Sequence, residues 1–472
     1  MKEFLKRLLV LPLFLLIVPL FSQTYSTGAI LDPSIYEQTS AKPVLLTRNY
    51  TSVPRSVSLR QFSPIPEDQG RYGTCTGWAT AFAARTISES IALNRNNQRQ
   101  STENVFSPIH VYKGYYFLRG INPTGHEGAI ISHVLDFLKR EGAVRRPQFE
   151  LNTDFPLIMF SAYANSRRYP ISDYVRLFSN RSGVPGTIND RVLPVKKSLS
   201  DNKPVIIGMN TPPSFYQARD VWRPYENPNM NFGGHAMCVV GYDDNRYGGA
   251  FEVQNSWGTN WGERGYIWIT YNDFARFVSE AYEIIENLAS YRNGTQYAAS
   301  IEIQVFNSSA GMPVTFDRQG FYRTRTSYPS GTDFRFLITN RHPAYVYAFA
   351  ADSTTANVNR IFPLRGVSPV MDFIDSTVAW PGEFDWIRLD DTVGTDYLVV
   401  LFSKEALDIN GIEQRFARER GTFPERVSRA VGQNFIPYSN VRYINDRIEF
   451  SAETNNPRSV FGLLLAIDHR AR

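Results

Sequence analysis

Hydrophobic residues spaced three and four positions apart predict a helix that begins at Cys75. The same spacing predicts a second helix over residues 129–140, which Gly142 ends. One face of the first helix carries Cys75, Trp78, Ala79, Phe82, Ala83 and Ile87. The chain from residue 75 to residue 140 is therefore predicted to be mainly helical.

The pattern then changes to short apolar or alternating runs, which are typical of strands. These runs cover residues 174–178, 205–209, 235–242, 251–254 and 265–270, with a short helix near 190–200. A helical half beside a sheet half predicts a binding cleft between the two. This part of the chain is therefore expected to have an α+β fold.

Beyond Asn293 and Gly294, strand-like runs are separated by Pro, Gly, Asp and Thr. The runs cover residues 300–306, 334–339, 344–350, 397–403 and 460–467. This pattern predicts an antiparallel β-sandwich. A helix near residues 412–416 is expected to lie on its surface.

The first residues have the pattern of a secretory signal. Lys2, Lys6 and Arg7 precede an apolar run over residues 8–21, and Ser22 offers a small residue at the cleavage point. The run is shorter than the roughly 20 residues that span a membrane. We therefore expect cleavage near Ser22, a secreted, periplasmic or cell-surface location, and no stable membrane span afterwards.

Composition excludes few functions. The 472 residues are 43% hydrophobic and carry a net charge of +5, with two cysteines. Because no Lys/Arg block alternates with aromatic residues, the sequence does not predict nucleic-acid binding. Two cysteines cannot form a disulfide framework.

Cys75 is the first candidate for chemistry. It follows a glycine-punctuated loop that begins at Gln69. The unpaired N–H groups at a helix start favour an anion, so a thiol there is expected to lose its proton more readily. The alternative is a small cysteine buried under a helix.

His235 and Asn255 supply what Cys75 lacks. His235 enters a strand after two glycines, and Asn255 follows the next strand. A thiolate needs a proton acceptor, and an imidazole needs a group that fixes its orientation. Either residue alone could be structural, but together with Cys75 they form a complete catalytic set.

These stretches resemble the papain-like cysteine peptidases. The loop from Gln69 to Cys75, with Gly70 and Gly73, is similar to the family's nucleophile motif, and Gly234-His235-Ala236 is similar to its histidine strand. The stretch from Asn255 to Tyr266, with Trp257, Trp261 and Gly262, is the most specific match. The spacings between the three motifs exceed the usual ones modestly, which loop insertions would explain.

The resemblance implies a role for each matched position. Cys75 would be the nucleophile, paired with a protonated His235 that Asn255 orients and Trp257 shields. Gln69 and the Cys75 N–H would bind the oxyanion. No metal or cofactor is implied. Gly125 and Gly128 resemble, more loosely, the segment that binds the substrate backbone.

The sequence also departs from familiar members. Thr76, not Trp, follows the nucleophile, and Tyr72 stands where a cysteine is usual. Cys238 is expected to be a core residue, since its offset of three from His235 points it to the opposite face of a regular strand. The lead-in lacks a helical apolar pattern, so we expect no helical prosegment, and secretion or the second domain would restrain activity.

The sequence thus predicts a signal peptide (1–22), an extended lead-in (23–60), a two-lobed papain-like domain with a helical and a β-barrel-like lobe (61–292), and a β-sandwich domain (296–472). In the last, residues 345–349, 361–364, 381–382 and 394–403 resemble a domain of unknown function that is appended to bacterial peptidase and kinase modules. This domain is expected to bind a protein or cell-surface partner or to position the enzyme. The expected activity is that of a secreted cysteine endopeptidase acting on polypeptides. Alternatives are a catalytically silent peptide-binding module and a thioester-based acyl transferase.

Overall fold

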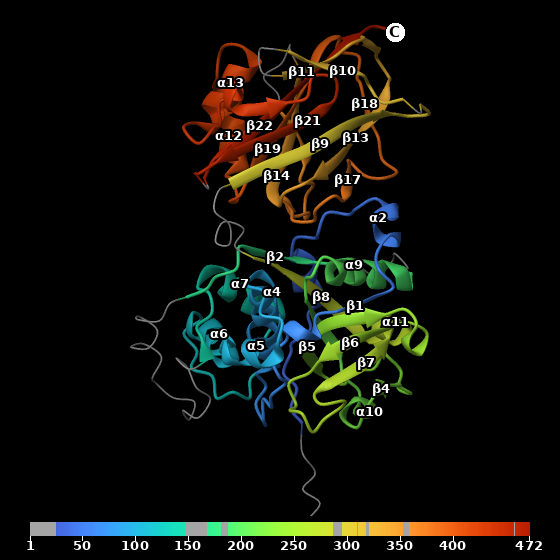
Figure 1. Cartoon of the computed structure of the whole chain (residues 1–472), viewed down its shortest axis with the longest axis vertical. Helices are drawn as coiled ribbons and strands as arrows, with labels where there is room; N and C mark the ends of the chain where they lie inside the picture. Colours follow the sequence, from blue (N-terminus) through green and yellow to red (C-terminus); the bar gives the residue numbers. More distant parts are fainter. Residues whose placement is uncertain are drawn as a thin grey trace, which may run out of the picture.

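The computed structural model describes residues 25–146, 168–180, 187–286, 295–308, 310–317, 321–352, 358–456 and 458–472. The predicted signal peptide and the predicted domain end at residue 292 lie outside these ranges. A body of helices and one sheet lies below a body made mainly of strands (Figure 1). A separate hydrophobic core fills each body.

Helices make up one half of the lower body. The predicted helix at Cys75 is confirmed: α3 (Cys75–Gly77) passes directly into the π-helical segment η2 (Trp78–Arg85) and then into α4 (Thr86–Ala92). The other helices here are α5 (Gln98–Glu103), α6 (Pro108–Phe117) and α7 (Ile131–Arg140), the last confirming the second predicted helix. Val134, Leu135 and Leu138 of α7 are fully buried, which places its apolar face in the core.

The other half is a sheet in the order β2-β8-β3-β5-β6-β7-β4, with β1 added to β5. Its strands are β1 (Ser56–Ser58), β2 (Asp173–Arg176), β3 (Val205–Asn210), β4 (Val221–Trp222), β5 (Gly234–Asp243), β6 (Ala250–Gln254), β7 (Tyr266–Thr270) and β8 (Val278–Ile285). The helices α9 (Ile188–Ser200), α10 (Pro213–Tyr216) and α11 (Tyr271–Phe277) accompany it. Strand β5 is buried from His235 to Tyr242 and runs through the middle of the sheet. Each strand predicted in this region is present.

The upper body is a sandwich of two sheets. One has the order β10-β11-β22-β19-β14-β15 and the other β17-β13-β9-β21-β20. The strands are β9 (Thr295–Val305), β10 (Val314–Asp317), β11 (Phe321–Thr324), β12 (Tyr328–Pro329), β13 (Asp333–Asn340), β14 (Ala344–Asp352), β15 (Asn359–Phe362), β16 (Val370–Met371), β17 (Thr377–Trp380), β18 (Ile387–Arg388), β19 (Gly394–Ser403), β20 (Val441–Tyr443), β21 (Ile448–Thr454) and β22 (Val460–Arg470). The predicted sandwich is confirmed, and its described strand pairs are antiparallel except that β11 and β12 pair with β22 in parallel.

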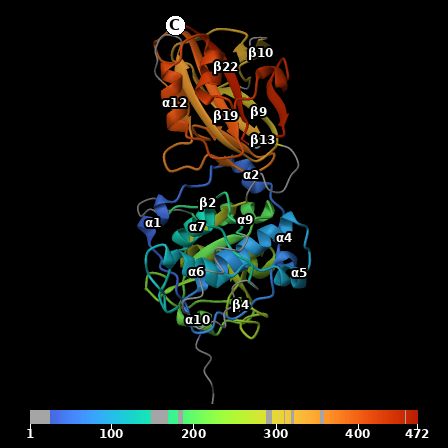
Figure 2. The same cartoon turned by 90° about the vertical axis from the view of Figure 1, so that its left-hand side faces the viewer.

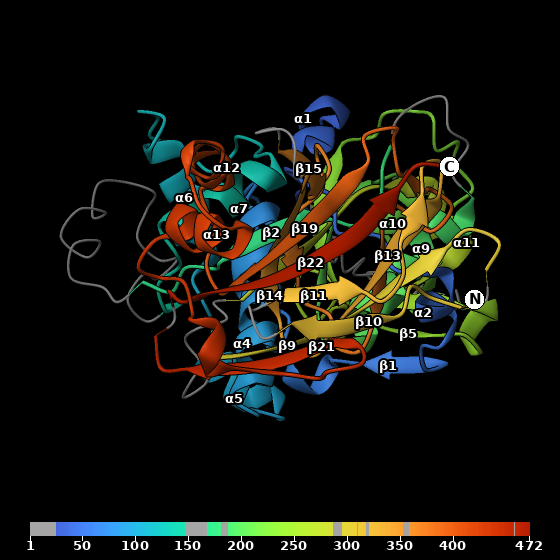
Figure 3. The same cartoon turned by 90° about the horizontal axis from the view of Figure 1, so that it is seen from above.

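Two helices cover the outer face of the first of these sheets. They are α12 (Ile409–Arg418), near the predicted position, and α13 (Phe423–Val431), which the sequence analysis did not identify. Figure 3 shows both beside β19 and β22. Val399 and Leu401 face the helices, while Leu398 and Val400 face the other sheet. Burial on both faces explains why the β19 sequence is apolar at consecutive positions.

The lead-in is more structured than predicted. It contains α1 (Pro33–Gln38) and α2 (Thr47–Thr51), and it passes from the lower body to the junction with the upper body, where α2 lies (Figure 2). It then returns to add β1 to the sheet of the lower body. No helix in the described ranges is long and apolar enough to cross a membrane.

Candidate active site

Cys75 is the first residue of α3, and its side chain is completely buried. Two glycines near it permit the close packing that holds it there. A side chain at Gly77 would overlap the carbonyl of Pro108 in α6, and Gly73 packs against the backbone of His126 and Glu127. The Cys75 Sγ accepts a hydrogen bond from the N–H of Ala236 in β5 at 3.5 Å. The helix start is therefore in direct contact with the histidine strand.

His235 and Asn255 are joined because β5 and β6 are neighbours in the sheet. His235 Nε2 lies 2.7 Å from Asn255 Oδ1. The Ser256 N–H donates to the same Oδ1 at 2.7 Å, which identifies that atom as the oxygen. Because an amide oxygen only accepts, the proton of the neutral ring lies on Nε2, and Nδ1 is the basic nitrogen. Nδ1 has no hydrogen-bond partner among the described residues.

Trp257 covers this pair, as the resemblance implied. Its ring is stacked on His235 with centroids 4.7 Å apart, and it is completely buried. The rings of Tyr25 and Tyr216 also stack against Trp257, at 4.9 Å and 5.1 Å. The hydrogen bond between His235 and Asn255 is thus kept from water.

Gln69 is buried and held in a fixed orientation. Its Oε1 accepts from the Ser256 hydroxyl at 2.6 Å, and its Nε2 donates to the Tyr72 carbonyl at 2.7 Å. One of the two Nε2 protons is therefore left for an oxyanion. Ser256 is a supporting residue that the sequence analysis missed, although it lies inside the quoted Asn255 motif.

The expected thiolate–imidazolium pair does not describe this state. Burial raises the pKa of the Cys75 thiol to about 12, against hydrogen bonds from backbone N–H groups that lower it. Burial also lowers the pKa of His235 to about 4, against its bond to Asn255. Both groups are therefore neutral, because water that would stabilise their charges is excluded.

The lead-in is what excludes the water. Residues 25–31, which we call the cleft segment, cross the site between β5 and the start of α7. The Ala29 N–H donates to Gly234 O at 3.0 Å, the Ile30 N–H donates to Ala129 O, and the Ala129 N–H donates to Gly28 O.

Two glycines fit the cleft segment to the site. A side chain at Gly28 would overlap the Gly73 backbone, and one at Gly234 would overlap the Ala29 carbonyl. Trp257 Nε1 donates to Ser26 O at 2.8 Å. The sequence analysis expected no helical prosegment and assigned the restraint of activity to secretion or the second domain, whereas here an extended part of the lead-in covers the site. The placement of the cleft segment was not predicted, because an extended segment has no periodicity and owes its position to contacts distant in sequence.

The cleft segment also places the side chain of Leu31 in a site on the peptidase domain, which we call the Leu31 pocket. Leu31 lies against Gly208 and Gly234, with Ile131 and Glu280 beside it. Glu280 is 1% exposed and accepts from the Asp32 N–H and the Tyr282 hydroxyl. Burial raises its pKa to about 7. This carboxyl group was not predicted, because β8 lies far from the motifs in the sequence.

The other predicted positions are placed as follows. Gly128 packs against Gly28 and Ile30 of the cleft segment, so it borders the cleft, while Gly125 accepts from the Gly73 N–H and supports the Cys75 loop. Cys238 is a buried free thiol in the core. The described residues contain no group of three or more His, Cys, Asp or Glu side chains suited to a metal.

A hydrogen-bonded series of Ser, His and Asp side chains also occurs in the upper body. Ser330 Oγ lies 2.9 Å from His469 Nε2, and His469 Nδ1 lies 3.0 Å from Asp396 Oδ2. The amides that would stabilise an oxyanion there are already used, since the Ser330 N–H donates to Arg470 O and the Gly331 N–H to Leu389 O. These residues therefore hold β22 to its neighbours.

A buried thiol at a helix start, bonded to the strand whose imidazole an amide orients, is the arrangement expected of the thiol hydrolases. Comparison with protein families matches residues 53–284 to the papain family cysteine proteases. This part of the chain is a papain-family cysteine peptidase domain.

Individual relatives are distant. An uncharacterized peptidase C1-like protein of Acanthamoeba polyphaga mimivirus is 28% identical over 251 residues, which are 49% of this chain and 71% of that protein. Peptidase 1 of Dermatophagoides pteronyssinus is 25% identical, over 47% of this chain and 62% of its own length. Among solved structures, xylellain, a cysteine protease from Xylella fastidiosa, is 22% identical with a TM-score of 0.43, over 56% of this chain and 96% of xylellain.

The burial of His235 and Glu280 in the closed site predicts how release of the cleft segment depends on pH. Burial in the closed state lowers the pKa of His235 from 6.5. Release of the cleft segment hydrates the ring and restores the higher pKa, so acidification toward pH 4 favours release. The pKa of Glu280 is raised from 4.5 to about 7, so acidification from pH 7 toward 4.5 favours the closed state. The two effects oppose each other. Protection of residues 25–31 from amide exchange should change little between pH 7 and pH 5.

Glu280→Gln should remove the opposing effect. In this variant, protection should then fall by roughly 20-fold between pH 7 and pH 5, as measured by mass spectrometry with correction for intrinsic exchange. Glu252→Gln is the control, since Glu252 is also buried but pairs with Arg60. An identical pH response in Glu280→Gln and the wild type would contradict the prediction.

Proposed function

We propose that this protein is a secreted cysteine endopeptidase, synthesised in a closed form and acting through Cys75, His235 and Asn255. The observation that carries the proposal is the arrangement of these groups. A basic Nδ1 is left on His235 by the bond to Asn255, and the next residue of the same strand bonds to the Cys75 sulfur.

In the first half of the reaction, His235 Nδ1 takes the thiol proton as Cys75 Sγ attacks the carbonyl carbon of the substrate. The oxyanion that forms is bound by the Cys75 N–H and by the remaining Nε2 proton of Gln69. His235 then gives its proton to the amine nitrogen, the C–N bond breaks, and a thioester remains.

In the second half, His235 takes a proton from water, whose oxygen attacks the thioester carbonyl. The tetrahedral intermediate collapses, the C–S bond breaks, and the sulfur regains a proton from His235. The carboxylic acid product leaves. Asn255 keeps the ring in one orientation through both halves of the reaction, because its oxygen accepts a hydrogen bond from the Nε2–H group throughout.

The cleft segment must leave before a substrate can bind, since Cys75 is completely buried beneath it. We propose export through the apolar N-terminal run, with cleavage near Ser22, which mass spectrometry of the mature N-terminus would test; an intact Met1 would contradict it. The strand-rich C-terminal domain is proposed to position the enzyme or to bind a protein partner.

The Leu31 pocket supports a substrate class. Leu31 shows that an aliphatic side chain fits, and Glu280 places a carboxyl group at the wall. No cation pairs with Glu280 among the described residues. We propose that the pocket accepts aliphatic side chains and also lysine or arginine, which would pair with Glu280 once the cleft segment leaves.

Removal of residues 25–31 tests the proposed activity. The shortened chain should hydrolyse unfolded polypeptides, while the full-length chain should be slower by at least ~10-fold. In the shortened chain, Cys75→Ala should abolish hydrolysis, and Gln69→Ala should lower kcat by about 10²–10³. Cys238→Ala is the matched control. Equal hydrolysis by the Cys75→Ala variant, or transfer to added amines instead of water, would contradict peptidase action.

Glu280→Gln in the shortened chain tests the substrate class. The ratio of kcat/KM for peptides with lysine or arginine in the Leu31 pocket over those with leucine should fall by about tenfold, because the charged partner is lost. Peptide-library profiling measures this ratio. Glu252→Gln should leave it unchanged. An unaltered profile in Glu280→Gln would show that this carboxyl group does not select substrates.

A further inference from the structure

The lead-in contacts both bodies a few residues beyond the cleft segment. The Ala41 N–H donates to Gly366 O at 2.7 Å, and the Ser368 N–H returns a bond to Ala41 O at 2.8 Å. On the other side, the Lys42 N–H donates to Arg176 O in β2 at 2.9 Å. The lead-in therefore lies as a shared strand between the two domains.

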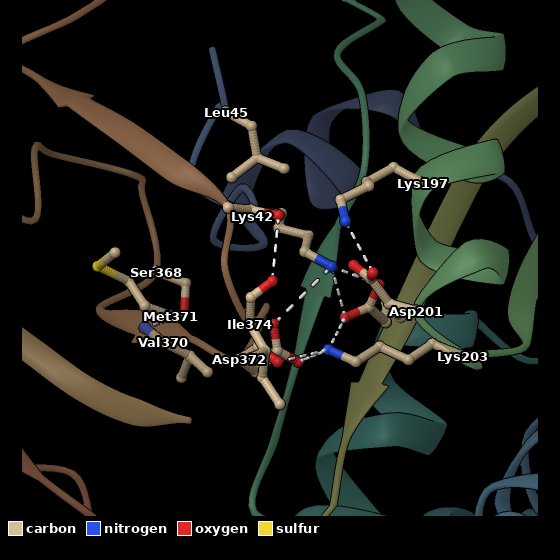
Figure 4. Close-up of polar contacts among 12 residues, drawn as sticks. Lys42, Leu45, Lys197, Asp201, Lys203, Ser368, Val370, Met371, Asp372 and Ile374 are labelled. Carbon is tan, nitrogen blue, oxygen red and sulfur yellow. Dashed lines mark hydrogen bonds and ion pairs between the residues drawn. The ribbon is translucent and has the colours of Figure 1, made fainter. Parts of the chain in front are cut away.

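Four charged side chains meet at the same place, and we call them the interdomain charge cluster: the buried carboxylates Glu283 and Asp372 and the half-buried Lys42 and Lys203. Lys42 Nζ lies 2.6 Å from Glu283 Oε2 and 3.8 Å from Asp372 Oδ1. Lys203 Nζ lies 3.1 Å from Glu283 Oε1 and also pairs with Asp372. Figure 4 shows Lys42 and Lys203 pointing toward Asp372.

The cluster has two positive and two negative members, so its charges balance only when all four are present. The side chains of Glu283 and Asp372 are 0% and 5% exposed. Burial acts to raise the pKa of Glu283, but Lys203 and Lys42 outweigh it and hold that pKa below its usual range. Loss of one member leaves an uncompensated buried charge, which is strongly unfavourable. Only Asp372 comes from the C-terminal domain.

Apolar contacts reinforce this attachment. Leu45 of the lead-in is 2% exposed within the core of the C-terminal domain, and the Leu46 N–H donates to Thr377 O at 2.9 Å. Val175 and Ile285 of the peptidase sheet pack in a cluster with Tyr345 of β14.

A rigid connector joins this attachment to the active site. Helix α1 begins directly after the cleft segment, with the Asp32 side chain accepting from the N–H groups of Ser34 and Ile35. Tyr36 is completely buried and donates to Phe178 O at 2.9 Å. Residues 32–40 therefore cannot move freely between their two fixed ends.

We propose that the C-terminal domain controls the active site by holding the lead-in through the interdomain charge cluster, which keeps the cleft segment over Cys75. A short tether with a fixed end gives the cleft segment a high effective concentration at the site. Release of residues 40–46 removes one of the two anchors of residues 32–40, so that Tyr36 leaves its contact more often, the free tether lengthens and that concentration falls. The inference rests on the proposed function in one respect, namely that the cleft segment keeps substrate away from Cys75.

The test uses the full-length chain with Cys75→Ala, so that no self-cleavage intervenes. Amide exchange of residues 25–31 is measured by mass spectrometry in Asp372→Asn and in Lys42→Met. Both should exchange about tenfold faster or more in this segment, because each leaves an unbalanced buried charge. Asp333→Asn is the matched control, since its pair with Arg388 is in the same domain but exposed. It should leave exchange in residues 25–31 unchanged.

Exchange in β19 shows whether the C-terminal domain remains folded. If Asp372→Asn also loosens β19, Lys42→Met decides, because it leaves the C-terminal sequence intact. Faster exchange in residues 40–46 with unchanged exchange in residues 25–31 would overturn the inference. Because exchange needs no catalysis, this result is independent of the proposed activity, whose failure would appear as an inactive chain lacking residues 25–31.

Discussion

The contact between the start of α3 and strand β5 is the constraint on which the active site depends. It brings the Cys75 sulfur to the Ala236 N–H, next to the histidine that would take its proton. Helix and strand come from different halves of the domain, so the chemistry exists only when the halves are packed together. Within the helical half, Gly77 permits α3 to pack closely on α6, because a side chain there would overlap Pro108.

The same burial that assembles the site also keeps its thiol and imidazole uncharged. A thiol and an imidazole shut away from water both remain neutral, and here a segment of the chain's own lead-in provides the cover. The fit is specific, since Gly28 and Gly234 leave just enough space for one backbone to cross the other. The lead-in then continues through a capped helix to the interdomain charge cluster, which is shared with the C-terminal domain. Catalytic readiness and domain attachment are thus linked along one stretch of chain.

Sequence reasoning identified the parts whose chemistry is local. Cys75, His235 and Asn255 stand in motifs with recognisable spacing, and helical and strand periodicity located most of the elements around them. It could not locate Glu280 or the cleft segment, because neither has a local pattern and both acquire a role from residues distant in sequence. It also could not foresee the neutral state of Cys75 and His235, since the shift in each pKa arises from burial. The parallel pairing of β11 with β22 was missed for a related reason, because strand periodicity does not encode partner or direction.

The reactivity of the two cysteines toward iodoacetamide tests the account most directly, with Cys238 as an internal reference buried in the core. Peptide mapping would follow alkylation of Cys75 in the full-length chain and in the chain without residues 25–31. The account predicts slow alkylation of Cys75 in the full-length chain, rapid alkylation once the segment is removed, and slow alkylation of Cys238 in both. Equal rates at Cys75 with and without the segment, or a Cys75 that stays as inert as Cys238, would contradict it.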